Sequence, residues 1–148
     1  MSLSNQVLTH LVRTAAVIHR NGADSKFRRV ILINGYQRFS EPFRELCNLL
    51  YLKENNQLIG DIFIEIDGHT TFTLGYTLDS VYWSKGYASE ALKSVFKAMN
   101  ETYSFKICLC HVYEDNIKSI KLLERNGFDK IHKSWFYQDV LYRKMLNK

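Results

Sequence analysis

Proline and glycine are scarce in this chain of 148 residues, which contains one proline and seven glycines. Linkers between domains are commonly rich in proline, glycine and serine, so the composition gives no sign of a second domain, and no solenoid repeat is present. Hydrophobic residues make up 46% of the chain and aromatic residues 14%. That supply is sufficient for a substantial core and argues against disorder. We therefore expect a single domain over residues 1–148.

Cysteine is scarce as well. Cys47, Cys108 and Cys110 are an odd number of thiols without a second cluster of ligand-like residues. This pattern predicts neither a disulfide framework nor a zinc site. Cys108 and Cys110 share one face of a predicted strand, which favours buried thiols in a reducing compartment.

Long hydrophobic runs are lacking. Residues 15–18 form an apolar run, but His10, Arg13, His19 and Arg20 interrupt it on both sides. The run is too short for a membrane-spanning or signal segment. We expect a soluble, cytoplasmic protein that has no membrane partner.

An excess of acidic residues is also absent. Lys and Arg number 20 against 15 Asp and Glu, which gives a net charge of +5 and a pI near 9.1. A basic protein favours a polyanionic partner, but the basic residues are spread along the chain. Either nucleic acid or a phosphate-rich cofactor could be such a polyanionic partner.

The N-terminal part of the chain has helical periodicity. Apolar residues recur at helical spacing over residues 5–20. Asp24 or Ser25 could cap a second helix that runs toward Phe39, although residues 29–34 also fit a strand. Two such helices could form a helix-turn-helix reader of DNA or a lid on the substrate side. The second helix is mostly apolar where a recognition helix needs polar side chains, so we favour the lid.

Strands follow beyond Pro42. Alternating apolar residues predict an antiparallel meander of three strands, over residues 46–53, 57–66 and 70–78. Helices are then expected over residues 87–100 and 116–125, and strands over residues 105–113, 128–133 and 139–146. This order predicts an α/β (α+β) fold with a mixed, mostly antiparallel, twisted sheet flanked by helices, two of them N-terminal.

Residues 74–90 join a predicted strand to a predicted helix through a short turn that contains Gly86. The first N–H groups of a helix lack intrahelical partners and the helix dipole adds positive charge there, so such a turn can bind a phosphate. Gly86 leaves room for a close ligand. Ala88 and Ser89 are small, so they leave the N-terminal end of the helix, its mouth, open to a ligand. A lone glycine before a helix also serves as a flexible entry, so the turn alone leaves both interpretations open.

Two motifs carry a family resemblance. The turn reads Trp83-Ser84-Lys85-Gly86-Tyr87-Ala88, which fits the signature Gln/Arg-x-x-Gly-x-Gly/Ala with tryptophan in the first place. Asn116 with the downstream pair Gly127-Phe128 forms the second motif, and the pairs Ile59-Gly60 and Gly75-Tyr76 also fit. By these residues, residues 45–146 resemble the GNAT superfamily of acyl-CoA-dependent N-acyltransferases. The chain is most similar to the branch of the ribosomal-protein N-terminal acetyltransferases, in which that tryptophan is usual.

The resemblance implies a single acyl-CoA N-acyltransferase domain that uses acetyl-CoA as the acyl donor. The N–H groups of residues 84–89 would hold the pyrophosphate, and the backbone of residues 76–78 would pair with the pantetheine arm like an added strand. The splay between the strands at 70–78 and 105–113 would admit the thioester. The implied cofactor-binding residues are Tyr76, Thr77, Leu78, Ser84, Lys85, Gly86, Tyr87, Ala88, Ser89, Asn116 and Ser119.

The implied reaction needs a neutral amine, a base or water chain that takes its proton, and a donor for the leaving thiolate. It needs neither a metal nor a covalent nucleophile. His111 lies five residues before Asn116, where several family members place a glutamate base. An imidazole is chemically suited to that role, although His111 could instead merely fill its strand face. Further base candidates near the acceptor side, each of which also fits a solvated turn, are Glu65, Asp67 and His69.

Three features depart from the family pattern. Thr73 stands two places before Gly75, where this branch often carries an acidic residue. Leu123 stands where a tyrosine often protonates the thiolate, so Ser119 or a water would take that role; Ser119 equally fits a packing role. The usual arginine-rich first strand is not evident before Asn5, so either the acceptor side is altered or another chain, as in a homodimer, completes the sheet.

Two functions stay open at this point. The leading hypothesis is transfer of an acetyl group from acetyl-CoA to a primary amine by direct attack on the thioester. The alternative is a catalytically degenerate CoA-binding or nucleic-acid-binding module on the same fold, with nucleic acid the less favoured partner. The acceptor, a small-molecule or peptide amine, is open because acceptor loops vary most.

Overall fold

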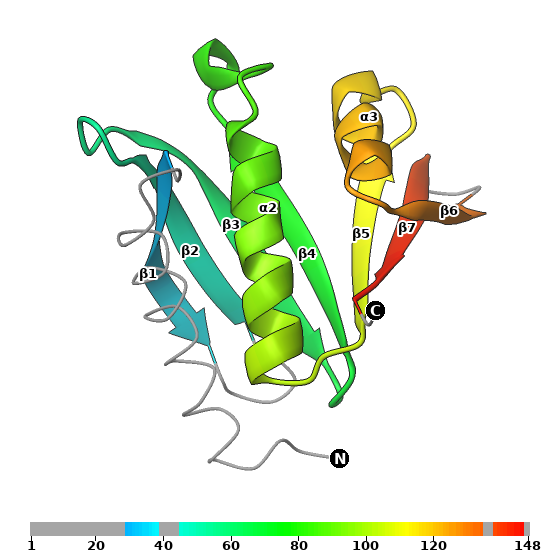
Figure 1. The fold of residues 1–148 in the computed structure, drawn as a ribbon. Coiled ribbons are helices and arrows are strands. Elements are labelled where there is room, and N and C mark those ends of the chain that lie inside the picture. The colour runs from blue at the N-terminus through cyan, green and yellow to red at the C-terminus, as the bar shows by residue number, and fades with distance from the viewer. Residues whose placement is uncertain (1–28, 39–44, 135–137, 147–148) are drawn as a thin grey trace.

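The computed structural model describes residues 29–38, 45–134 and 138–146 of the chain. Within these ranges seven strands form one sheet in the order β1-β2-β3-β4-β5-β7-β6. The sheet is twisted, and helices α2 and α3 lie against it (Figure 1). The mixed, mostly antiparallel sheet flanked by helices that the sequence predicts is therefore confirmed.

The first four strands form an antiparallel meander. They are β1 (Val30–Arg38), β2 (Glu45–Leu52), β3 (Leu58–Asp67) and β4 (Thr71–Leu78). Apolar and polar residues alternate in β3, which buries Ile62, Ile64 and Ile66 on one face. The predicted hairpin of β2 and β3 and the turn into β4 are both present.

Strand β1 stands where the sequence predicts a second helix. The helix prediction is wrong over Val30–Arg38, and the alternative of a strand over 29–34 is confirmed and extended. The strand begins with a run of β-branched and apolar side chains, which favour extended backbone once β2 offers a partner along its length. A helix-turn-helix reader that uses these residues is thereby excluded. The predicted helix over residues 5–20 lies outside the described residues.

Strand β1 is the first of the described strands and forms one edge of the sheet. It pairs with β2 at the edge of the sheet, with Val30 opposite Leu52 and Arg38 opposite Glu45. Among the described strands, the one at this edge of the sheet therefore comes from the chain itself.

Helix α2 (Tyr87–Lys97) crosses the sheet and ends in a π-helical turn over Ala98–Thr102 (Figure 1). Its buried side chains are Ala91, Leu92, Ser94, Val95 and Phe96. The remaining elements are β5 (Ile107–Tyr113), α3 (Ile117–Arg125), β6 (Asp129–Lys133) and β7 (Asp139–Met145). No helix in the described ranges is both long enough and apolar enough to span a bilayer.

The three thiols lie inside the molecule. Cys47, Cys108 and Cys110 are free cysteines and all are buried, which confirms the burial predicted for the last two. Burial raises the pKa of the Cys110 thiol to about 12 and raises that of Cys108 as well. In the described part of the chain, no three His, Cys, Asp or Glu side chains gather as a metal site requires.

The two central strands β4 and β5 are parallel neighbours only at their start. Their pairing covers Thr71 to Thr73 on β4 and Ile107 to Leu109 on β5. Beyond these residues β5 stays paired with β7, while β4 stays paired with β3. The two halves of the sheet therefore diverge, and a gap opens toward the C-terminal ends of β4 and β5 (Figure 1).

Candidate functional site

Among the described strands, none pairs with the last part of β4 on the side that faces β5. β4 is bonded to β3 up to Leu78, but its pairing with β5 ends at Thr73. The backbone of Gly75 to Leu78 on the β5 side can therefore accept an extended ligand as an additional strand. Trp83 Nε1 donates to the Leu78 carbonyl at 2.7 Å and fixes the following turn to the end of this strand.

A cavity of about 440 Å³ lies between the diverging ends of β4 and β5. Its lining residues come from β4, β5, the first turn of α3 and the start of β7. They are Gly75, Tyr76, Cys110, His111, Val112, Tyr113, Asn116, Ser119 and Asp139. Both residues that the sequence predicts as catalytic, His111 and Ser119, thus lie on one cavity, together with Asn116 and Tyr76.

A hydrogen bond joins the two walls of this cavity. The Tyr76 hydroxyl donates to Ser119 Oγ at 3.0 Å, so β4 is connected to α3. Asn116 caps α3, because its Oδ1 accepts from the Ser119 backbone N–H at 3.2 Å. Burial raises the pKa of Tyr76 to about 12, so the phenol keeps its proton at neutral pH.

The Tyr76 side chain lies on the candidate site, and the sequence prediction did not consider it, since only its backbone was assigned a role. Leu123, which replaces the usual tyrosine on α3, is fully buried in the core and cannot reach the cavity. The sequence shows a tyrosine directly after Gly75. Its side chain can be assigned to the site only once α3 is known to lie opposite β4, and that is a long-range contact between Tyr76 and Ser119.

His111 lies on the exposed face of β5 and pairs with a carboxylate. Its Nδ1 is 3.2 Å from Asp139 Oδ2, and its side chain is 55% exposed. Because the buried residues of β5 are Cys108, Cys110 and Val112, His111 does not fill the core face. A carboxylate at Nδ1 orients the imidazole and leaves Nε2 available to another group. Asp139 was missed because its nearness depends on the register of β5 against β7.

The other base candidates lie away from the cavity. Glu65 and Asp67 are exposed residues at the end of β3, and His69 is exposed in the turn that follows. This turn precedes β4, whereas the cavity lies toward the end of β4. None of these three described residues lines it.

The turn before α2 has the conformation of an anion site. Gly86 is the N-cap with φ of +83°, and Ser84 also has a positive φ of +61°. The first intrahelical bond runs from Glu90 N to Gly86 O, so the N–H groups of Tyr87, Ala88 and Ser89 face the mouth of the helix. Their geometry and the helix dipole suit a phosphate.

Side chains around the turn are less free than the sequence suggests. The Ser89 hydroxyl accepts a hydrogen bond from Asn126 Nδ2 at 3.0 Å, which ties α2 to the end of α3. Lys85 Nζ lies 5.8 Å from the ring centroid of Tyr82, beside the turn. Lys118 Nζ lies 4.8 Å over the Trp83 ring and adds a cation from α3 that the motif does not contain.

Comparison with known proteins agrees with this architecture. A sequence profile described as the Acetyltransferase (GNAT) domain matches residues 8–129. A GNAT-family acetyltransferase from Bacillus anthracis has a TM-score of 0.61 and 20% identity, over 68% of this chain and 66% of that one.

Two further solved structures share the fold. The ribosomal-protein-S5-alanine acetyltransferase from Vibrio fischeri has a TM-score of 0.61 and 22% identity, over 70% of this chain and 62% of that one. The N-acetyltransferase PseH of Campylobacter jejuni, in complex with acetyl coenzyme A, has a TM-score of 0.58 and 17% identity, over 68% of this chain and 67% of that one. This chain spans less than two thirds of the length of the first two structures that it matches. Because the profile covers most of the sequence and the sheet has the matching fold, the chain belongs to the GNAT acetyltransferase family.

Proposed function

We propose that this protein transfers an acetyl group from acetyl-CoA to a primary amine. One observation carries the proposal: the pairs Tyr76–Ser119 and His111–Asp139 line the same cavity between the diverging strands β4 and β5. A proton acceptor and a hydrogen-bond donor are the two groups that aminolysis of a thioester requires. Family membership and the acetyl coenzyme A complex of one solved structure with this fold support the choice of acyl donor.

The described residues offer binding partners for two parts of acetyl-CoA, the pyrophosphate and the pantetheine arm. The N–H groups over residues 84–89, with the charge of Lys85, would hold the pyrophosphate at the mouth of α2. The free edge of β4 over residues 76–78 would hold the pantetheine arm, and Asn116 would contact it from α3. Bound there, acetyl-CoA supplies the activated acyl group.

The residues of the cavity divide the proton transfers between them. His111 Nε2 accepts the proton of the amine, directly or through a water, and Asp139 stabilises the imidazolium that results. Ser119, which accepts the Tyr76 hydrogen bond, can direct its own O–H toward the leaving sulfur. Tyr76 and Ser119 would thereby take the role of the tyrosine whose place Leu123 occupies.

Calorimetry and a transfer assay test the proposal separately. Titration with acetyl-CoA is expected to give saturable heat, and CoA release is expected with at least one member of an amine panel. The panel should contain N-terminal peptides, polyamines, aminoglycosides and amino sugars, because solved structures with this fold include a spermidine N-acetyltransferase and a nucleotide-linked sugar GNAT. No binding at millimolar acetyl-CoA would refute the proposal.

A second candidate function is CoA binding without transfer. The specific observation in its favour is that Leu123 is fully buried and Thr73 stands in place of an acidic side chain. Saturable CoA binding without CoA release across the whole panel would favour this degenerate module. Retention on DNA with a steep salt dependence would instead favour a nucleic-acid partner.

Trp83 supports membership of the ribosomal-protein N-terminal acetyltransferase branch, and a ribosomal-protein-S5-alanine acetyltransferase is among the structures with this fold. Peptides with an N-terminal alanine or serine are therefore the first acceptors to test. Transfer to such a peptide in preference to spermidine would support the branch.

A further inference from the structure

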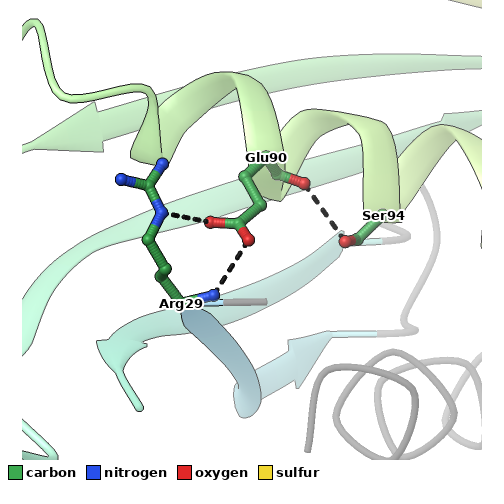
Figure 2. A network of polar contacts seen from close by, with 3 residues as sticks. All are labelled: Arg29, Glu90 and Ser94. Carbon is green, nitrogen blue, oxygen red and sulfur yellow. Dashed lines mark hydrogen bonds and ion pairs between the residues drawn. The ribbon is translucent and has the colours of Figure 1, made fainter. Parts of the chain in front are cut away.

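A cation from outside the family motif lies at the mouth of α2. Arg29 directly precedes β1, and its backbone N–H donates to Glu90 Oε1 at 2.9 Å. Its Nε lies 3.5 Å from Glu90 Oε2, so one carboxylate holds both the backbone and the side chain of the arginine. Figure 2 shows the two terminal nitrogens of the guanidinium on the side away from Glu90.

Glu90 is a suitable anchor because it is fixed and largely shielded from water. It belongs to the first turns of α2, and its side chain is 18% exposed. Among the described residues, its buried Oε2 has the ion pair with Arg29 and no hydrogen-bond donor. Its carbonyl accepts a hydrogen bond from Ser94 Oγ at 3.1 Å, as Figure 2 also shows. The carboxylate therefore requires the arginine as its counter-charge.

The guanidinium is placed over the turn itself. Arg29 Cζ lies 4.5 Å from the centroid of the Tyr87 ring, a cation–π contact that helps to hold the guanidinium in place. Its Nη2 lies 3.1 Å from the position that a Cβ on Gly86 would occupy. Since the Arg29 side chain is 52% exposed, its terminal N–H groups can donate to a ligand at the helix mouth.

We propose that Arg29 is a phosphate-binding residue, whose terminal nitrogens bind the pyrophosphate of CoA beside the N–H groups of the α2 turn. This inference depends on the proposed function. The arginine fork matches phosphate oxygens, and anchoring by Glu90 and Tyr87 limits the side-chain entropy that binding would cost. Arg29 also offsets the Glu90 carboxylate, which alone would repel a diphosphate at this place.

The test is calorimetric titration of the full chain with CoA, dephospho-CoA and pantetheine. Replacement Arg29→Gln is expected to weaken CoA and dephospho-CoA binding by about 10- to 100-fold, the loss typical of a charge-assisted hydrogen bond. Pantetheine lacks phosphate, so its binding should not change. Lys130→Gln, which removes an exposed cation on β6, is the matched control and should bind CoA like the wild type.

Arg29→Gln alone leaves the Glu90 carboxylate unpaired and could destabilise the fold. The double variant Arg29→Gln with Glu90→Gln removes both charges, so it separates a loss of CoA binding from a loss of stability. Weak CoA binding by the double variant, with a normal thermal midpoint, supports the proposal. CoA binding by either variant as tight as in the wild type, or tighter, overturns it. A loss confined to CoA and absent with dephospho-CoA overturns the assignment to the pyrophosphate and indicates the 3′-phosphate. If wild-type protein itself gives no heat with CoA, the proposed function fails, and this inference fails with it.

Discussion

At the scale of the residue, the His111–Asp139 pair gives the sharpest distinction between a base and a structural histidine. His111→Gln is expected to lower kcat about 10²- to 10⁴-fold, the usual contribution of a general base. It should also remove the pH step that an imidazole base imposes on kcat/KM, while CoA affinity remains near that of the wild type. The measurement is a pH–rate profile with the best acceptor of the panel.

His132→Gln is the matched control for this prediction. His132 is an exposed histidine on β6 outside the cavity lining, so its replacement should leave the profile unchanged. Asp139→Asn keeps the imidazole but removes the carboxylate, and we expect an intermediate loss of kcat. A wild-type profile in the His111 variant would reject the base role.

Tyr76 is the second residue whose role can be isolated. Tyr76→Phe removes the hydroxyl that donates to Ser119 and leaves the ring in place. We expect kcat to fall by about 10-fold, while KM for acetyl-CoA changes little, because Tyr76 orients the Ser119 hydroxyl, whose donation to the leaving sulfur acts mainly in the transition state. Replacement Tyr113→Phe, at an exposed tyrosine on the same cavity for which no contact with Ser119 is shown, is the comparison. Equal effects of the two changes would contradict the assigned role of Tyr76.

At the scale of the element, two glycines separate backbone strain from ligand binding. Gly86 and Gly68 both have positive φ, at +83° and +73°, so alanine should cost about 1–2 kcal/mol of unfolding free energy at either position. Only at Gly86 would the new Cβ crowd the proposed phosphate site, because nothing lies within 4 Å of a Cβ at Gly68. We expect Gly86→Ala alone to weaken CoA binding. Urea unfolding and calorimetry measure the two quantities, and an equal loss of CoA affinity in both variants would contradict this prediction.

The same scale shows what local sequence can predict. The helix expected over residues 116–125, the turn with Gly86 before α2 and the β2–β3 hairpin all depend on neighbours within a few residues, and these predictions are confirmed. For β1 the sequence favoured a helix and left a strand over residues 29–34 as the alternative, because a continuous apolar run has no clear period. Its conformation is decided by pairing with β2.

The residues of the candidate site also fall into those that local motifs predict and those that depend on long-range contacts. The turn and Asn116 could be found from motifs, but the partners of the predicted residues could not. Asp139 reaches His111 through the β5–β7 register, and Arg29 reaches Glu90 across 61 positions of sequence. Such contacts depend on the packed sheet, where short-range patterns carry no information.

At the scale of the whole molecule, the buried thiols set an alkaline limit on stability. Burial raises the pKa of Cys110 to about 12 and also raises the pKa of Cys108, relative to 9.0 for an exposed thiol. The unfolded chain therefore loses these protons at a lower pH than the folded protein. Their contribution to stability is complete below pH 9 and is lost as pH rises from about 9 toward 12.

The expected result is an unfolding free energy that falls with pH in this window, by about 1.4 kcal/mol per pH unit for each thiol that stays protonated in the fold. Cys110→Ala should be less stable at pH 7, because a buried group is removed, but its stability should decline less steeply between pH 9 and 11. Urea unfolding at a series of pH values measures both slopes. Tyr76, with its pKa raised to about 12, adds its own loss only above the pKa of an exposed tyrosine near 10, so the first part of the decline isolates the thiols. Parallel slopes in the wild type and the Cys110 variant would mean that this thiol does not set the limit, and that another group of the core does.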